Sequence, residues 1–234
     1  MAMLSALEAD WLEYARSIAA CDPTHRAECV QRGGGSAVGP DPELRWPGFI
    51  GSDYEANPFR VLCVAQIHNP NGWSASASGL APMEPLLREW LDGWLRDEAF
   101  LAKYRDEYAQ RLPTWGPWRK AFGPVLRDPR IGLSPTEIAY VNIAKCWLSP
   151  GANQYELMRS CERWKGIASL LAVVKPDAVV FLSGKTPLRY AGVTVPEDVP
   201  WRFFSGRSFI VSAANIETMI AWLAQVKADS TDSR

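Results

Sequence analysis

The feature that most constrains the fold is a short apolar run that turns abruptly polar. Residues 61–65, Val-Leu-Cys-Val-Ala, have the length and composition of a buried strand. The next residues are mostly polar, and a turn-forming Pro-Asn-Gly follows at residues 70–72. Ligands of open α/β sheets bind at the carboxyl ends of strands, so this pattern predicts polar groups facing a crevice. A strand that simply ends in a solvated turn is the alternative interpretation.

Two further segments repeat this pattern. Residues 138–144 are apolar or aromatic around a single Asn142, and residues 178–182 are apolar throughout. Because helical patterns separate these strands, the sequence predicts an α/β fold: a three-layer sandwich with a central, mostly parallel sheet flanked by helices. The polar residues after the three strands should then lie along one edge of the sheet. Helices are predicted over residues 3–20, 154–174, 187–191 and 215–226, and short strands over residues 202–204 and 208–211.

The rest of the chain predicts a long insertion, and its composition excludes several classes of protein. Its 234 residues fit a single domain, residues 1–234, with a helical insertion at about residues 83–130. Residues 33–58 are rich in Gly and Pro and are predicted to be irregular. A net charge of −1 excludes a strongly basic surface but not a local positive groove. No apolar run approaches the ~20 residues of a membrane span, and no signal-peptide pattern is present, so we expect a cytoplasmic protein without membrane association.

The five cysteines are more naturally thiols or metal ligands than disulfides in such a protein. Cys63 lies inside the first predicted strand and is expected to be a core residue. Cys21 and Cys29 have seven residues between them, Cys146 follows the second strand, and Cys161 lies in a predicted helix. Metal ligation by these last four thiols and separate burial of each are both compatible with the sequence.

One group of segments carries a family likeness. An Asn-x-x-Lys-Cys segment at residues 142–146 is followed by Cys161 and then by a Lys-Pro strand, residues 175–184, that ends in Gly. Together these segments resemble the uracil-DNA glycosylase superfamily, most closely its iron–sulfur branches. The likeness spans residues 60–72 and 140–192, and a weaker likeness covers residues 208–222. It implies a monomeric DNA glycosylase that flips a pyrimidine out of DNA and hydrolyses its N-glycosidic bond, leaving an abasic site.

The resemblance assigns catalytic and base-reading roles. Asn69 is similar to the Asn that holds the attacking water in the mismatch-type branches, and Gln66 falls where the iron–sulfur branches place Glu. His68 makes this loop one residue longer, so the sequence does not decide which of the three side chains positions the water. Asn142 matches the Asn that reads the polar edge of the flipped pyrimidine.

The second catalytic motif departs from the family pattern. Where the family usually has a His followed by Pro, this chain has Ser-Ala-Ala-Asn at residues 212–215. Either another donor, His68 or Ser212, stabilises the departing base, or the substrate differs, or the protein is inactive. Trp73 is a candidate to stack on the flipped base, with a core position as the alternative. Candidate phosphate contacts are Lys145, Lys185 and Arg207.

The resemblance also implies a cofactor. In the iron–sulfur branches four cysteines hold a [4Fe–4S] cluster, and their order is matched here by Cys21, Cys29, Cys146 and Cys161. The first two of these are spaced more widely than the family's usual close pair. Tetrahedral zinc is the alternative occupant of four thiolates.

The expected substrate follows from the shape of the motif loop. The loop lacks the tyrosine that excludes 5-substituted pyrimidines in the strictest uracil enzymes, and residues 74–79 are small. With the helical insertion, this predicts a roomier pocket for a modified pyrimidine, such as glucosylated hydroxymethylcytosine in phage DNA, and hence a role in antiviral defence. The alternatives are uracil excision in base-excision repair, a non-catalytic DNA-binding relative, and a hydrolase of small nucleosides.

Overall fold

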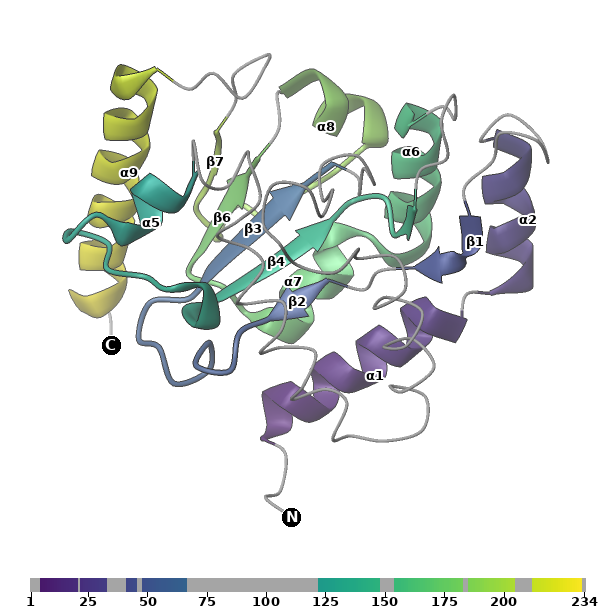
Figure 1. The fold of residues 1–234 in the computed structure, drawn as a ribbon, viewed down its shortest axis with the longest axis horizontal. Helices are drawn as coiled ribbons and strands as arrows, with labels where there is room; N and C mark the ends of the chain where they lie inside the picture. Colours follow the sequence, from purple (N-terminus) through teal and green to yellow (C-terminus); the bar gives the residue numbers. More distant parts are fainter. Residues whose placement is uncertain are drawn as a thin grey trace, which may run out of the picture.

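A five-stranded sheet forms the centre of the protein (Figure 1). The computed structural model describes residues 5–20, 22–32, 41–45, 48–66, 122–147, 154–182, 185–204 and 212–232. The strand order is β2-β4-β3-β6-β7; the last four run parallel, and β2 pairs antiparallel with β4. The predicted α/β fold with a mostly parallel sheet is therefore confirmed. The strands are β2 (Phe49–Ile50), β3 (Val61–Ala65), β4 (Ile138–Asn142), β6 (Ala178–Phe181) and β7 (Trp201–Phe203).

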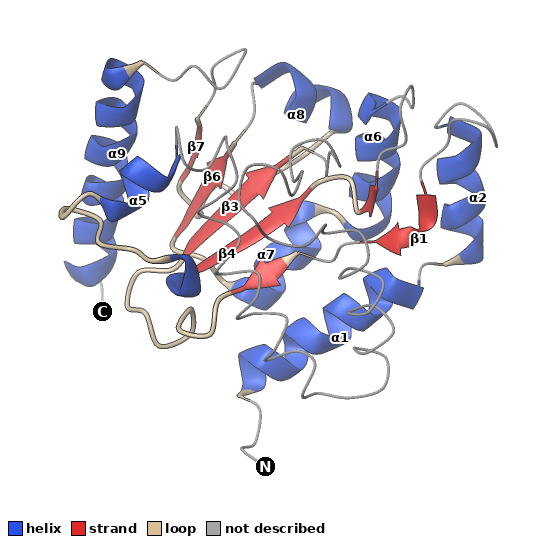
Figure 2. Cartoon of the chain, viewed as in Figure 1, coloured by secondary structure: helices blue, strands red, loops and turns tan. Residues whose placement is uncertain are grey.

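Helices cover both faces of this sheet (Figure 2). On one face lie the short α5 and the long α9, which closes the described part of the chain. On the other face lie α1, α6, α7 and α8, and α2 packs outside them against α6. The helices are α1 (Ala6–Ala20), α2 (Pro23–Arg32), α5 (Gly123–Arg127), α6 (Gln154–Lys165), α7 (Ile167–Val174), α8 (Lys185–Ala191) and α9 (Ala213–Asp232).

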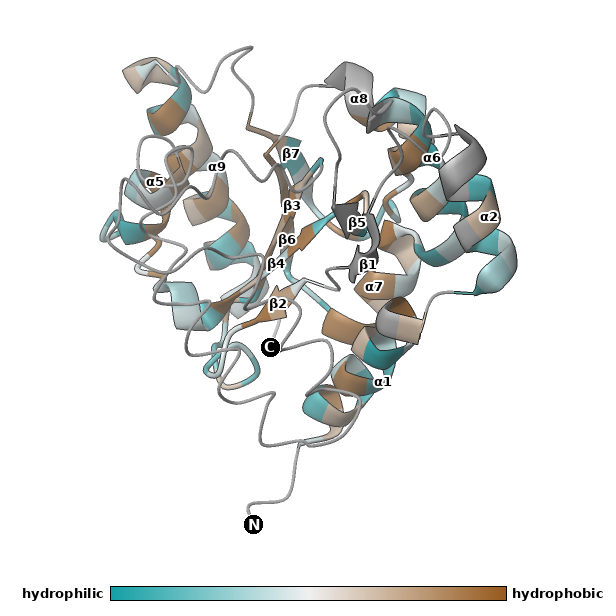
Figure 3. Cartoon of the chain, turned by 45° about the vertical axis from the view of Figure 1, so that its right-hand side comes forward, coloured by the Kyte–Doolittle hydropathy of each residue, from teal (hydrophilic) through white to brown (hydrophobic). Residues whose placement is uncertain are grey.

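Strand β3 shows why its sequence is continuously apolar. Its side chains alternate between the two faces: Val61, Cys63 and Ala65 join the core under α5 and α9, whereas Leu62 and Val64 join the core under the other helices. All five residues are buried, and the sheet lies between two apolar layers (Figure 3). A central parallel strand has no solvated face, so no polar alternation is found within it. The expected core position of Cys63 is confirmed.

The order of the strands creates a switch point beside β3. The chain leaves β3 and enters β4 on one side, then returns to β6 on the other side of β3. The segment that leaves β3 leads to α5 on one face, whereas β6 leads into α8 on the opposite face. In doubly wound sheets this reversal opens a crevice at the carboxyl ends of the two diverging strands. The crevice is thus expected between the ends of β3 and β6.

The helix predicted over residues 154–174 is two helices. It breaks at Gly166, because the backbone N–H of Ile167 turns away from the helix and donates to both carboxylate oxygens of Glu162, at 3.1 Å each. A Cβ atom at Gly166 would lie 2.4 Å from the backbone oxygen of Glu162, so a side chain does not fit there. Glycine thus permits a sharp turn that periodicity alone does not reveal.

The segment predicted to be irregular, residues 33–58, contains two strands. One is β2, and the other is β1 (Asp41–Arg45), which pairs antiparallel with β5 (Cys146–Trp147) in a separate two-stranded sheet. Helix α2 was also not predicted. Of the proposed insertion, residues 83–121 lie outside the described part of the chain, as does the predicted strand at 208–211.

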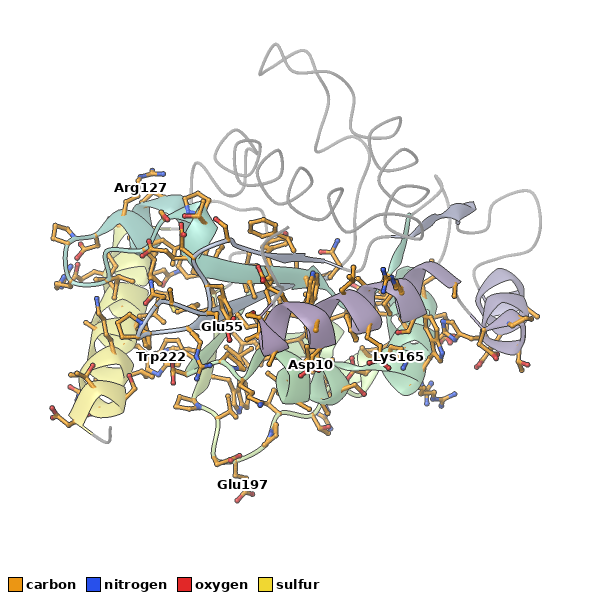
Figure 4. All side chains as sticks on the ribbon, turned by 90° about the horizontal axis from the view of Figure 1, so that it is seen from below. Asp10, Glu55, Arg127, Lys165, Glu197 and Trp222 are labelled. Atoms are coloured by element: carbon orange, nitrogen blue, oxygen red, sulfur yellow. The ribbon has the colours of Figure 1, made fainter. Side chains whose placement is uncertain are left out.

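At the amino edge of the sheet, hydrogen bonds join segments that are far apart in the sequence. The backbone N–H of Arg60 donates to Asp177 Oδ2 at 2.8 Å, and the Tyr54 hydroxyl donates to the Val174 carbonyl at 3.1 Å. Figure 4 views the molecule from this side and shows Glu55 in the loop before β3. These bonds tie the loops before β3 and β6 to each other. No helix in the described ranges is long and apolar enough to cross a membrane.

Candidate functional site at the carboxyl edge

The carboxyl ends of three parallel strands meet at one edge of the sheet. Ala65 of β3 is in register with Asn142 of β4, and the backbone N–H of Ala144 donates to the Gln66 carbonyl at 2.9 Å. On the other side of β3, the N–H of Leu182 donates to the Val64 carbonyl at 2.8 Å. Gln66 and Asn142, two of the predicted site residues, therefore lie on neighbouring strand ends beside the switch point.

Asn142 is a polar residue in an apolar position. Its exposed fraction is 1%. By the alternation of β4 it follows Ile138 and Tyr140, which face the core under α5 and α9. Its backbone carbonyl accepts a hydrogen bond from Lys145 Nζ at 2.5 Å, which ties the end of the strand to the following turn. This bond fixes the backbone at the strand end from which the buried carboxamide projects.

Lys145 is buried, which contradicts its predicted role as a phosphate contact. Its exposed fraction is 1%, so the ammonium group cannot reach a DNA backbone on the surface. Burial lowers the pKa of Lys145 to about 8, although the nearby Cys161 and Glu162 act in the opposite direction. The prediction failed because position at a strand end was taken to mean exposure, while here the turn after β4 folds inward.

Cys161 and His25 lie side by side in the buried layer between α2 and α6. Cys161 has no exposed surface, His25 is 6% exposed, and Sγ lies 4.0 Å from Nε2. The backbone N–H of Lys145 also donates to Cys161 Sγ, at 3.4 Å. The imidazole is stacked on the indole of Trp164, with ring centroids 4.3 Å apart and planes inclined by 21°. The ring is therefore held in one orientation beside the sulfur.

The start of α2 explains how His25 reaches this place. Asp22 caps the helix, because its Oδ1 accepts from the backbone N–H groups of Thr24 at 2.8 Å and His25 at 3.1 Å. These bonds, that of His25 first, hold the pKa of the Asp22 carboxyl below its usual value. Helix α2 then packs against α6, which carries Cys161. The sequence contained a signal that we did not use: Cys21, His25 and Cys29 recur at intervals of four residues, one helical turn apart.

Two more polar groups lie near this pair. The carboxyl of Glu162 has a raised pKa because of its burial, which two favourable interactions, with the Ile167 N–H and with Lys145, only partly offset. The Tyr14 hydroxyl is buried, and within the described part of the chain it has no hydrogen-bond partner. Burial raises the pKa of Tyr14 most, and Cys161 and Glu162 raise it further. This side of the sheet thus contains a concentrated polar cluster inside an apolar layer.

The four predicted cysteine ligands lie in different parts of the chain. Of the four cysteines, Cys161 is the one whose side chain is described; Cys29 lies in α2 and Cys146 begins β5. Among the described side chains, no group of three or more His, Cys, Asp or Glu is placed to hold a metal ion. The donor found next to Cys161 is an imidazole nitrogen, which a four-thiolate cluster does not require. The four-cysteine ligand set stays a prediction.

The second motif and its surroundings lie at the end of β7. Ser212 is exposed, and its Oγ accepts from the Asn215 N–H at 3.2 Å, which gives it the role of a helix cap for α9. Between β7 and α9 is a cavity of about 190 Å³ lined by polar and apolar residues, among them the exposed Arg202. The sequence analysis did not single out Arg202. The lining residues are Arg202, Phe203, Phe204, Asn215, Thr218 and Met219.

Several predicted site residues lie outside the described residues: Cys21, His68, Asn69, Trp73 and Arg207, together with the side chain of Lys185 at the start of α8. Their roles stay predictions. Compared with known proteins, the chain matches no family model and no curated protein.

Proposed function

We propose that the protein is a DNA base glycosylase that flips a pyrimidine into the crevice at the carboxyl edge and hydrolyses its N-glycosidic bond. The observation that supports this most is the register of β3 and β4, which puts two carboxamide residues, Gln66 and Asn142, on adjacent strand ends beside the switch point. A crevice at this edge is the usual ligand site of such a sheet. An everted base also needs fixed donors and acceptors on its polar edge, which a buried carboxamide supplies.

In the proposed reaction each residue has a distinct task. Asn142 binds the polar edge of the flipped base, and the hydrogen bond from Lys145 to its carbonyl holds the strand end in place. Gln66, with the predicted Asn69, orients a water molecule toward C1′ of the sugar. The bond from C1′ to the base nitrogen breaks with its electrons on the base, while the water oxygen forms the new bond to C1′ and the proton that it loses passes through solvent to the departing base. Hydrogen bonds to the departing base stabilise its developing negative charge.

The proposed substrate is a modified pyrimidine in phage DNA, such as glucosylated hydroxymethylcytosine, and the proposed role is antiviral defence. The test is incubation of the purified protein with uracil-containing DNA and with modified phage DNA, followed by quantification of abasic sites. Asn142→Ala and Gln66→Ala should each lower the rate of excision by at least about 100-fold if these carboxamides act on the base and the water. Gln225→Ala, an exposed carboxamide on α9, is the matched control and should excise at the wild-type rate. Excision of uracil but not of modified bases would reject the defence role.

A non-catalytic DNA-binding protein is the second candidate. It is favoured by one observation, that Ser212 at the second motif serves as a helix cap, a role that involves no contact with a departing base. Binding to duplex DNA with no abasic product from any of these substrates would select this candidate over the enzyme.

A further inference from the structure

Two exposed aromatic side chains pack against each other on the outer surface. In the described part of the chain three large apolar side chains are exposed: Tyr155 with an exposed fraction of 38%, Tyr190 with 48% and Trp201 with 44%. The rings of Tyr155 and Tyr190 have centroids 5.5 Å apart and planes inclined by 57°. A single exposed aromatic residue is ordinary on a protein surface. Two that touch and are both open to solvent indicate an interaction surface.

The helices that carry this tyrosine pair hold it in place. Tyr155 lies in the first turn of α6 and Tyr190 near the end of α8, and these two helices contact each other (Figure 1). The Tyr190 hydroxyl donates to Glu156 Oε1 at 2.7 Å, which ties the ring to α6. This hydrogen bond and the charge of Glu156 raise the pKa of Tyr190, so its hydroxyl stays neutral. The Tyr190 ring is therefore oriented before a partner binds, which lowers the entropy cost of binding.

The charges around the pair favour an anionic partner. Arg159 follows Tyr155 by one helical turn on α6, and Arg189 directly precedes Tyr190 on α8. Both arginines are exposed, and among the described residues neither forms an ion pair. Glu156 contributes one carboxylate, so two guanidinium groups against one carboxylate leave this surface with a net positive charge.

The pair lies at the same end of the sheet as the candidate site. Strand β6 ends at Phe181 and α8 begins at Lys185, while α6 follows β4 and β5 along the chain. A helix that follows a parallel strand begins at the carboxyl edge of the sheet. Tyr155, in the first turn of α6, is therefore near this edge, and its contact with Tyr190 places the whole pair there.

The geometry points to a nucleic-acid surface in which the two tyrosines stack on an unpaired base. Arg159 and Arg189 contact the phosphates on either side of that base. Proteins bind single strands by this combination, because every base has an aromatic face and every nucleotide carries a negative charge. The bases of an intact duplex are already stacked on one another, so the surface should prefer single-stranded DNA. The inference does not depend on the proposed glycosylase activity.

The test measures the affinity of the full-length protein for a fluorescently labelled thymidine oligonucleotide by anisotropy. Tyr155→Ala and Tyr190→Ala should each weaken binding by about 5- to 100-fold, the range for loss of one stacked base. Tyr190→Phe keeps the ring and loses the hydrogen bond to Glu156, so it should bind nearly as tightly as the wild type. Arg159→Gln should reduce the slope of log affinity against log salt by about 0.7. Trp201→Ala is the matched control, because Trp201 is similarly exposed but begins β7 at the amino edge, and it should bind like the wild type.

A second measurement locates the contact without any substitution. An oligonucleotide that contains iododeoxyuridine should crosslink on irradiation to Tyr155 or Tyr190 of the wild-type protein, as identified by mass spectrometry. Crosslinks confined to other residues, or unchanged affinity in both alanine variants, would overturn the inference. Equal affinity of the wild type for duplex and single strand would also do so, since phosphate contacts alone would then account for binding. A wild-type dimer that dissociates in Tyr155→Ala would assign the pair to a second copy of the chain and would overturn it as well. Excision is assayed separately, so failure of this surface leaves the glycosylase proposal standing, and the converse also holds.

Discussion

The two faces of the central sheet are built from the same strands but bury different kinds of side chain. The face under α5 and α9 is sealed by an apolar core. The face under α1, α6 and α7 has an equally apolar inner layer, yet its outer part holds His25, Lys145 and Ser160, three of the four buried polar residues in the described part of the chain. The remaining one, Asn142, lies at the carboxyl edge of the sheet.

The apolar and the polar side chains contribute differently to the stability of the fold. Burying an apolar side chain stabilises the native state directly, and no partner of particular geometry is needed. Burying a lysine, a histidine or a carboxyl group costs free energy unless each finds a charge or a hydrogen bond. In the polar cluster around Cys161, the Lys145 N–H and His25 contact the sulfur, and the Ile167 N–H donates to Glu162, so these groups partly satisfy one another.

We expect the largest loss of stability from substitutions in the apolar core under α5 and α9. Leu223 on α9 has no exposed surface. Leu223→Ala removes buried methyl groups and leaves a cavity, so the free energy of unfolding should fall by about 2–5 kcal/mol, measured by urea denaturation. A loss smaller than this range would show that the surrounding side chains collapse into the cavity.

On the polar face the effect of a substitution should be small. Lys145→Met should be at least as stable as the wild type, because burial of the ammonium outweighs its favourable interactions, as its pKa of about 8 indicates. Urea denaturation of both proteins measures the difference. A loss of about 2 kcal/mol or more would show that the hydrogen bond from Lys145 Nζ to the Asn142 carbonyl outweighs the cost of burying the ammonium.

The fold was largely predictable because the central strands are buried on both faces. The apolar run of β3 was predicted at Val61–Ala65 as observed, and β4 and β6 were predicted with one or two extra residues at their ends. Burial on both faces leaves an unbroken apolar run, which is the clearest signal that a short strand can give. Helix α2 was missed for the opposite reason. It packs on another helix and not on the sheet, so its sequence is mostly polar.

The candidate site was predictable where the sheet register decides it. Once β3 and β4 are parallel neighbours, Gln66 and Asn142 must end close together. The pair of His25 and Cys161 was not predictable in this way, because it depends on how α2 packs against α6, across 136 positions of sequence. The inward turn of Lys145 is also a tertiary feature, since no local pattern distinguishes it from an exposed strand end.

If DNA binds at the carboxyl edge, the charge that contacts it should be exposed there. Arg202 lines the cavity between β7 and α9 and is exposed, in register with Val180 of β6 near that edge, whereas Lys145 is buried. Arg202→Gln should therefore weaken DNA binding similarly for all sequences and reduce the slope of log affinity against log salt by about 1. Lys145→Met should leave that slope unchanged. DNA-binding titrations at several salt concentrations test both variants. An unchanged slope in Arg202→Gln would show that Arg202 does not contact the DNA.

The smallest effect is expected on the outer surface of the apolar face. Arg130 donates to Glu217 of α9 at 2.6 and 2.9 Å and to Asp128 at 2.8 and 3.1 Å, and these bonds lower the pKa of both carboxyl groups. A lowered carboxyl pKa contributes stability above the pKa of the unfolded chain, and this contribution is lost as the pH falls through the folded value.

Arg130→Met should therefore lower the thermal midpoint slightly at pH 7, and the difference from the wild type should vanish in acid, well below the ordinary carboxyl pKa values near 4. High salt should also reduce the difference, because all three side chains are at or near the surface. Thermal unfolding of both proteins across this pH range is the measurement. A difference that persists in acid would mean that Arg130 acts through packing of its aliphatic stem against α9, and the apolar face would then extend further outward than its buried core.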